Sequence, residues 1–338
     1  MKWARPALPE RAAYAVVGTA VALGALAPGA AGRLLAPALL LGLGVAHGAC
    51  DQWVVPATRP ALACRRGRYW AAFLGGYLGL AALAGAGWWW QPAGALALFL
   101  GLTAWHRGSA DAPELPAGQR GTWVLHSLLR GALLFAVPLG CWPAQTRAVL
   151  NGLLGLTGGA PVSAAALTLT ARLLAPAVLL GHALLWAGYW RRGQRAVLAT
   201  DVQEVALLGA LLAVLPPELS AGLYFVGWHS LRHVLRMNRL LGRAPATRWV
   251  GLGADLRFFL RRAALLLISL AALAVLYGSP WARAAGSQRL LSVALLAAAI
   301  VTLLHALLVT FGLDAARWRR GAAGDGWDES PETAKRLV

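Results

Sequence analysis

Residues 289–313 read RLLSVALLAAAIVTLLHALLVTFGL, with no Asp, Glu, Lys or Arg after Arg289. A helix that crosses the hydrocarbon core of a bilayer needs about 20 predominantly apolar residues. This stretch supplies them, and His305 is its only ionisable group past the first residue. Residues 289–313 are therefore predicted to form a membrane-spanning helix.

Similar apolar runs recur along the chain. With residues 289–313, the predicted spans are 12–30, 33–50, 69–90, 93–107, 121–140, 166–190, 197–215, 219–242 and 260–278. These segments, about ten in all, predict an all-α fold, a polytopic transmembrane helical bundle. Residues 143–158 form a weaker apolar patch, predicted to be an interfacial or re-entrant helix. Residues 1–316 are expected to form a single transmembrane domain, and residues 317–338 a polar, disordered cytoplasmic tail.

The composition excludes most other classes of protein. Hydrophobic residues make up 59% of the 338 positions and charged residues 13%, whereas a soluble domain is about half apolar and a quarter charged. A water-soluble globule, a disordered chain and a coiled coil do not fit. The formal net charge is +18, but the basic residues lie in short loops between apolar segments. That distribution is typical of topology determinants rather than of nucleic-acid binding.

Arginine clusters orient the predicted bundle. They follow the second, sixth, eighth and tenth predicted spans, at residues 59–68, 191–195, 243–262 and 317–320. If every segment spans, all the clusters fall on one side, and the opposite loops carry only scattered single arginines. The positive-inside rule places that side, and with it both termini, in the cytoplasm. The expected location is a cell membrane, as a multi-pass protein.

Nearly all of the seven histidines lie in, or at the end of, a predicted span. In the predicted topology several share the inner leaflet: His47, His106, His229, His233 and His305. Ionisable groups at membrane depth usually mark a function, and scattered structural histidines would not need to agree in depth. The remaining two, His126 and His182, have no supporting motif and are assigned structural roles.

Residues 224–233 read YFVGWHSLRH and place His229 four positions before His233. Side chains four apart project from one face of a helix, so both imidazoles can reach one cation, as in the HExxH helix of metalloproteases. A metal would need further ligands from other helices. The alternative is a pair of core histidines that are satisfied by their neighbours.

Two other stretches join a histidine to an aspartate, HGACD at 47–51 and HRGSAD at 106–111. Glycine lets another helix or a ligand approach closely, and an aspartate can accept a hydrogen bond from the second ring nitrogen of a metal-bound histidine. Asp51 lies four positions after His47, on the same helical face. The alternative is that each aspartate caps or ends its helix.

The donor types favour a first-row metal. Neutral imidazoles bind such metals, and open coordination positions would suit Fe(II) and oxygen chemistry. Cysteine ligation is disfavoured, since Cys50 points away from His47 on the helix and no second thiol is near it in the sequence. A haem is disfavoured because two histidines four apart cannot bind opposite faces of the ring.

Together these residues resemble the Brp/Blh family of beta-carotene cleavage enzymes. The resemblance runs from residue 40 to residue 315 and rests on three patterns. These are Tyr224-Phe225-x-x-Trp228-His229-Ser230-x-x-His233, the pair His47-Gly48-x-x-Asp51 and His106-x-Gly108-x-x-Asp111, and a closing Leu304-His305 with Asp314 beyond. Arg107 departs from the family pattern, which has an aromatic or apolar residue there, and Leu304 stands where proline is expected.

The resemblance implies a membrane-integral non-haem dioxygenase that splits beta-carotene at its central double bond with O2, giving two molecules of all-trans-retinal. Carried over by position, the Fe(2+) ligands and catalytic residues are His47, His106, His229 and His233. Supporting groups or alternative ligands are expected among His305, Asp51, Asp111, Glu204 and Tyr224, although Glu204 is favoured to pair with an arginine. The family also suggests a retinal-binding rhodopsin as the product acceptor.

Beta-carotene is a hydrocarbon that dissolves in membrane lipid, so a membrane enzyme can take it from the bilayer. Trp105, Phe225 and Trp228 flank proposed ligands and are predicted to line an apolar substrate tunnel, with ordinary helix packing as the alternative. The competing function is a transporter or channel whose histidines transfer protons or a metal ion. A purely structural partner of a membrane complex is a third reading. Transporters often contain two repeated halves, and no internal repeat stands out in this sequence.

Overall fold

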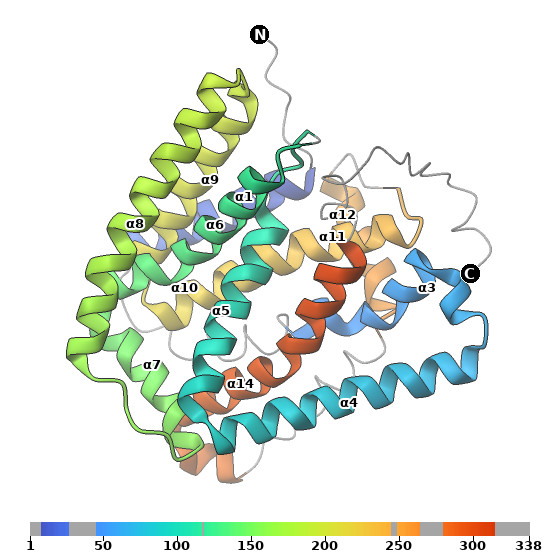
Figure 1. Cartoon of the computed structure of the whole chain (residues 1–338), viewed down its shortest axis with the longest axis horizontal. Helices are drawn as coiled ribbons and strands as arrows, with labels where there is room; N and C mark the ends of the chain where they lie inside the picture. Colours follow the sequence, from blue (N-terminus) through green and yellow to red (C-terminus); the bar gives the residue numbers. More distant parts are fainter. Residues whose placement is uncertain (1–7, 27–44, 117, 245–248, 264–279, 315–338) are drawn as a thin grey trace.

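The computed structural model describes residues 8–26, 45–116, 118–244, 249–263 and 280–314 (Figure 1). Within these ranges every regular element is a helix, which confirms the all-α prediction for this part of the chain. The longer helices are α1 (Leu8–Leu26), α4 (Arg66–Trp90), α5 (Pro92–Asp111), α6 (Arg120–Cys141), α8 (Ala164–Arg191), α9 (Arg195–Val214) and α14 (Pro280–Leu308). The shorter ones are η1 (Val45–Trp53), α3 (Val54–Thr58), η2 (Pro60–Ala63), α7 (Pro143–Leu156), α10 (Pro217–Leu223), η3 (Tyr224–Ser230), α11 (Leu231–Leu240), α12 (Trp249–Leu260) and η4 (Val309–Leu313).

The described residues contain 5 helices long and apolar enough to cross a membrane. They are α4, α6, α8, α9 and the stretch Gln288–Gly312, which begins after α14 kinks at Gly286. Arg11–Leu26 is a shorter apolar helix. Most of the predicted spans 33–50 and 260–278 lies outside the described residues. The total of about ten spans and the cytoplasmic termini therefore stay predictions.

Two predicted segments differ in detail from the structure. The segment 93–107 continues as α5 to Asp111, so His106 lies inside the helix rather than at its end. The segment 219–242 is divided into α10, η3 and α11, which follow one another after Pro216. Residues 143–158, predicted not to span, form the short helix α7.

Glycine brings α5 and α6 into backbone contact. A Cβ atom on Gly108 would overlap the carbonyl oxygen of Ser127, and one on Gly131 would overlap the carbonyl oxygen of Ala104. Small residues allow this approach between helices that cannot rely on a hydrophobic driving force in lipid. The sequence predicted that a glycine close to His106 would let another helix approach, and the contact at Gly108 agrees with this prediction. The contact fixes α5 against α6 two residues from His106.

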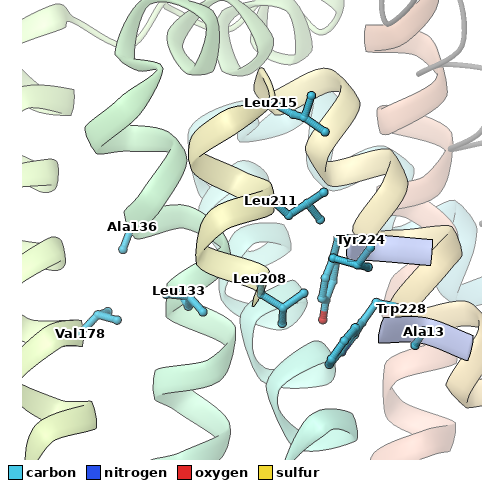
Figure 2. Close-up of a cluster of buried hydrophobic side chains, with 10 residues drawn as sticks. Ala13, Leu133, Ala136, Val178, Leu208, Leu211, Leu215, Tyr224 and Trp228 are labelled. Atoms are coloured by element: carbon cyan, nitrogen blue, oxygen red, sulfur yellow. The ribbon is translucent and has the colours of Figure 1, made fainter. Parts of the chain in front are cut away.

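A buried apolar cluster joins α1, α6, α8, α9 and η3. Its members include Ala13, Val17, Leu133, Ala136, Val178, Leu208, Leu211, Leu215, Tyr224 and Trp228 (Figure 2). Trp228 is fully buried and stacks on the ring of Tyr14 from α1, with ring centroids 5.4 Å apart. This cluster holds η3 in the interior of the molecule, where α5, α11 and α14 lie between α4 on one side and α8 with α9 on the other (Figure 1).

Candidate metal centre

Imidazole rings from separate elements gather in the interior. His106 comes from α5, His229 from η3, His233 from α11 and His305 from α14, and each is at most 3% exposed. Ring centroids are 5.0 Å apart for His106 and His229, 6.2 Å for His229 and His233, 5.1 Å for His233 and His305, and 4.8 Å for His305 and His106. The rings thus form a closed cycle, here called the histidine cluster. His47 lies in η1, four residues before Asp51, but its side chain lies outside the described residues.

A π-helical stretch positions one of these histidines. His229 lies in the last turn of η3, a π-helical stretch, and His233 follows in the α-helical turn of α11. Their rings are nearly parallel, at 14°. π-helical turns are rare and occur frequently at functional sites. A second π-helical stretch, η4, begins four residues after His305, at the end of the helix that carries it.

The histidine cluster fits a first-row metal in donor type and spacing. An imidazole nitrogen binds such a metal at about 2.0–2.1 Å, which puts ring centroids of two ligands about 4.5–6.4 Å apart for angles of about 90–180°. The observed centroid distances of 4.8, 5.0, 5.1 and 6.2 Å all fall in this range. Within the described part of the chain, however, no group of three or more His, Cys, Asp or Glu side chains already forms a coordination shell. To bind one ion, the ring nitrogens would have to turn toward a common point.

Asp51 contacts the histidine cluster through His305. The Nδ1 of His305 lies 2.9 Å from each carboxylate oxygen of Asp51. If the carboxylate is ionised it only accepts, so Nδ1 is the donor, and in a neutral imidazole Nε2 then keeps the lone pair. Gly48 lies against this pair, since a Cβ there would be 3.4 Å from both Asp51 Oδ2 and His305 Nδ1. Asp51 was expected to orient His47, whereas the contact described in the structure is with His305.

Asp111 joins α5 to the helices that hold His229 and His233. Its Oδ2 accepts from the hydroxyl of Tyr224 and from Nε1 of Trp228, both at 3.0 Å, and Arg232 Nη1 lies 3.7 Å from Oδ1. Asp111 is therefore a buried anchor between α5 and η3, rather than a group that only ends its helix. The hydrogen bond from its hydroxyl to Asp111 holds Tyr224 beside the histidine cluster.

Glu204 pairs with two arginines, as the sequence favoured. Arg130 from α6 donates to its Oε2, and Arg232 Nη2 lies 2.9 Å from its Oε1. Tyr14 Oη also donates to Oε1, at 3.1 Å. Glu204 thus connects α1, α6, α9 and α11 in one buried polar network.

Asp201 extends this network away from the histidine cluster. Its role was not predicted from the sequence. Its Oδ1 lies 3.1 Å from His126 Nε2 and 3.3 Å from Arg130 Nη1. Local spacing is the signal that could have indicated this network. Asp201 and Glu204 are three positions apart on α9, and His126 and Arg130 are four apart on α6, so each pair lies on one face of its helix. His126 and His182 lie in this outer part of the bundle, where His182 Nδ1 contacts the Val178 carbonyl oxygen at 2.9 Å.

Aromatic side chains surround the histidine cluster unevenly. Phe225 stacks on His229 at 17° with centroids 6.1 Å apart. Trp105 packs edge-on against Trp123 and donates from Nε1 to Thr310 Oγ1 at 3.3 Å. Trp228 instead lies in the apolar core with Tyr14. Phe225, which stacks on His229, is therefore the strongest of these candidates to contact a ligand at the cluster, whereas the contacts of Trp105 are with Trp123 and Thr310.

Comparisons with known proteins match most of the chain. A family profile described as beta-carotene 15,15'-dioxygenase matches residues 38–312. Over 293 residues the chain is 30% identical to a Halobacterium salinarum protein named probable beta-carotene 15,15'-dioxygenase Blh, and the alignment covers 82% of this chain and 83% of that protein. No solved structure matches the chain. The matched range includes every member of the histidine cluster.

Proposed function

Because the chain belongs to the beta-carotene 15,15'-dioxygenase family, we propose that it is a membrane-embedded, non-haem Fe(II) enzyme that cleaves the central double bond of beta-carotene. One beta-carotene and one O2 balance two molecules of all-trans-retinal. The cell membrane as its location, and a rhodopsin as the acceptor of retinal, are part of the same proposal.

The observation that carries the proposal is the buried histidine cluster. His106, His229, His233 and His305 would hold the iron, with Asp51 fixing the ring of His305. His47 stays a predicted ligand. Bound iron supplies the redox chemistry by which O2 reacts with an alkene. Carboxylate contact to a ligating histidine orients the ring and raises its basicity.

The protein's own residues supply position and exclusion of water. The histidine cluster is nearly inaccessible to solvent, and its aromatic neighbour Phe225 offers a flat apolar surface to a polyene. Trp105, which precedes His106 in the chain, stays a predicted substrate-lining residue. A hydrocarbon substrate has no polar group to recognise, so shape and apolar contact have to place the central double bond. Trp228 supports this arrangement from the core side, by holding η3 in place through Asp111.

Expression in cells that accumulate beta-carotene tests the proposal. The wild type is expected to bleach the cells and to produce retinal, and the purified protein to contain iron. H229A and H233A are expected to abolish retinal formation and to lower the iron content while the protein stays in the membrane. H182A is the matched control, since His182 is an equally buried histidine outside the cluster. Unchanged pigment with the wild type would contradict the enzyme and favour the transporter.

A further inference from the structure

Arg107 is a half-buried cation at the edge of the histidine cluster. Its Cζ lies 3.9 Å from the ring centroid of Phe225 and 5.7 Å from that of Tyr224. Several other interior arginines each pair with a carboxylate: Arg130, Arg232, Arg236 and Arg243. Arg107 makes no such pair with any residue that the structure describes. Its guanidinium lies against aromatic faces, and the Asp111 carboxylate, four residues further along α5, acts on its charge without a direct ion pair.

One nitrogen of this guanidinium has no acceptor among the residues that the structure describes. Nη1 of Arg107 is shielded from solvent and makes no hydrogen bond within the described ranges. Burying an N–H donor without an acceptor is unfavourable, and more so for a charged group. An acceptor brought by a ligand would remove this penalty. Because the surroundings are aromatic and apolar, the ligand that fits is an apolar molecule with one oxygen acceptor.

The position of Arg107 indicates which oxygen this is. Arg107 follows His106 directly, and the Phe225 ring on which it lies is stacked on His229. A beta-carotene molecule has no oxygen. Oxygen appears only on the two carbons of the cleaved bond, which must react beside the histidines.

We propose that Arg107 donates a hydrogen bond from Nη1 to the aldehyde oxygen of the retinal product, an inference that rests on the proposed function. Arg107 then recognises product and not substrate. Its loss should weaken retinal binding and leave beta-carotene binding unchanged. The hydrogen bond should also shift the absorption maximum of bound retinal to longer wavelength, because it polarises the carbonyl at the end of the polyene.

The test measures binding of all-trans-retinal without turnover, to purified full-length protein in detergent under anaerobic conditions. R107M removes the donors and keeps an unbranched apolar side chain. We expect about a tenfold or greater rise in Kd for retinal, in line with a hydrogen bond to a charged group, and loss of the absorption shift. The Kd for beta-carotene should stay within about twofold, the change expected when no such bond is involved. R195Q is the matched control, because Arg195 also lies over an aromatic ring, with its Cζ 4.6 Å from the centroid of Trp190, but on the exposed start of α9.

Each other outcome overturns the assignment. Equal retinal affinity in wild type and R107M would remove Arg107 from product binding. Oleate binding that depends on Arg107, with retinal binding that does not, would assign the residue to an anionic lipid. If R107M does not accumulate, R107Q serves the same purpose, with at least a threefold loss of retinal affinity expected and an unchanged affinity contradicting the proposal. Failure of the proposed function is seen separately, as absence of retinal in cells that make beta-carotene.

Discussion

His305 and Asp51 meet in a bidentate contact, with Nδ1 of the imidazole 2.9 Å from both carboxylate oxygens. The two residues are 254 positions apart in the chain, and both are almost completely buried. The contact joins the apolar helix α14 to η1. In a neutral His305 this contact favours the tautomer that carries its proton on Nδ1 and leaves the lone pair on Nε2.

The first prediction concerns this contact. D51N keeps one carbonyl oxygen that can accept from His305 but removes the negative charge. Because such partners orient the ring and raise its basicity, their loss typically costs roughly 10–100-fold in metal affinity or activity. We expect the iron content of purified D51N and its rate of retinal formation to fall together. The measurements are metal analysis and product quantification on equal amounts of folded protein.

D201N is the control for this experiment. Asp201 also contacts a buried histidine, with Oδ1 3.1 Å from His126 Nε2, but it lies outside the histidine cluster. Its replacement should lower thermal stability and leave the ratio of iron to folded protein unchanged. Equal loss of iron in D51N and D201N would show that the effect comes from general destabilisation.

The second prediction concerns the contact between α5 and α6. G108A introduces a methyl group where the Ser127 carbonyl oxygen leaves no space. Because the overlapping atom belongs to the backbone, it cannot move aside as the end of a flexible side chain can. We therefore expect the free energy of unfolding to fall by about 1–3 kcal/mol or more, and His106 to be displaced. Thermal denaturation in detergent measures the change. G101A is the control on the same helix, because a Cβ there meets nothing within 4 Å. Equal stability of the two variants would refute the steric argument.

Local spacing explains what the sequence could predict about the site. His229 and His233 are four apart, so their common face followed from helix geometry alone. His106 and His305 were placed at the same depth by the lengths of their apolar segments. The bond from Asp51 to His305 was not predicted, because nothing in either local sequence specifies a partner 254 positions away. The π-helical turn of η3 was also missed, since its sequence has no distinctive pattern.

The same distinction applies to the fold. Apolar length identified α4, α6, α8, α9 and the span within α14, since a bilayer requires it. It did not reveal the buried polar network, because a few charged residues hardly alter the average polarity of a long helix. Arg130 is 1% exposed inside α6, and its partners Asp201 and Glu204 come from α9. Only the packing of the two helices brings them together.

The third prediction concerns Tyr224. Y224F removes the hydroxyl that donates to Asp111 at 3.0 Å and keeps the ring that packs in the apolar core. We expect a stability loss of about 0.5–1.5 kcal/mol, read from thermal denaturation, and a reduced rate of retinal formation, because η3 carries His229. Y77F, on α4, is a control for the general effect of losing a tyrosine hydroxyl. A Y224F protein with wild-type stability would show that Trp228 and Arg232 satisfy Asp111 without Tyr224.

The last prediction concerns Glu204, which connects Arg130 of α6 with Arg232 of α11. E204Q preserves the shape of the side chain but leaves two arginines without this counter-charge. Removing one partner of a buried ion pair typically costs about 3–5 kcal/mol, so we expect a large fall in thermal stability. E114Q, at an exposed position, should have no effect. The double variant E204Q/R232M provides the decisive comparison. Contacting residues give non-additive losses, so the double variant should lose less stability than the sum of E204Q and R232M. Additive losses would mean that Glu204 stabilises the protein through Arg130 and Tyr14 alone, and that the network does not reach the helix that holds His233.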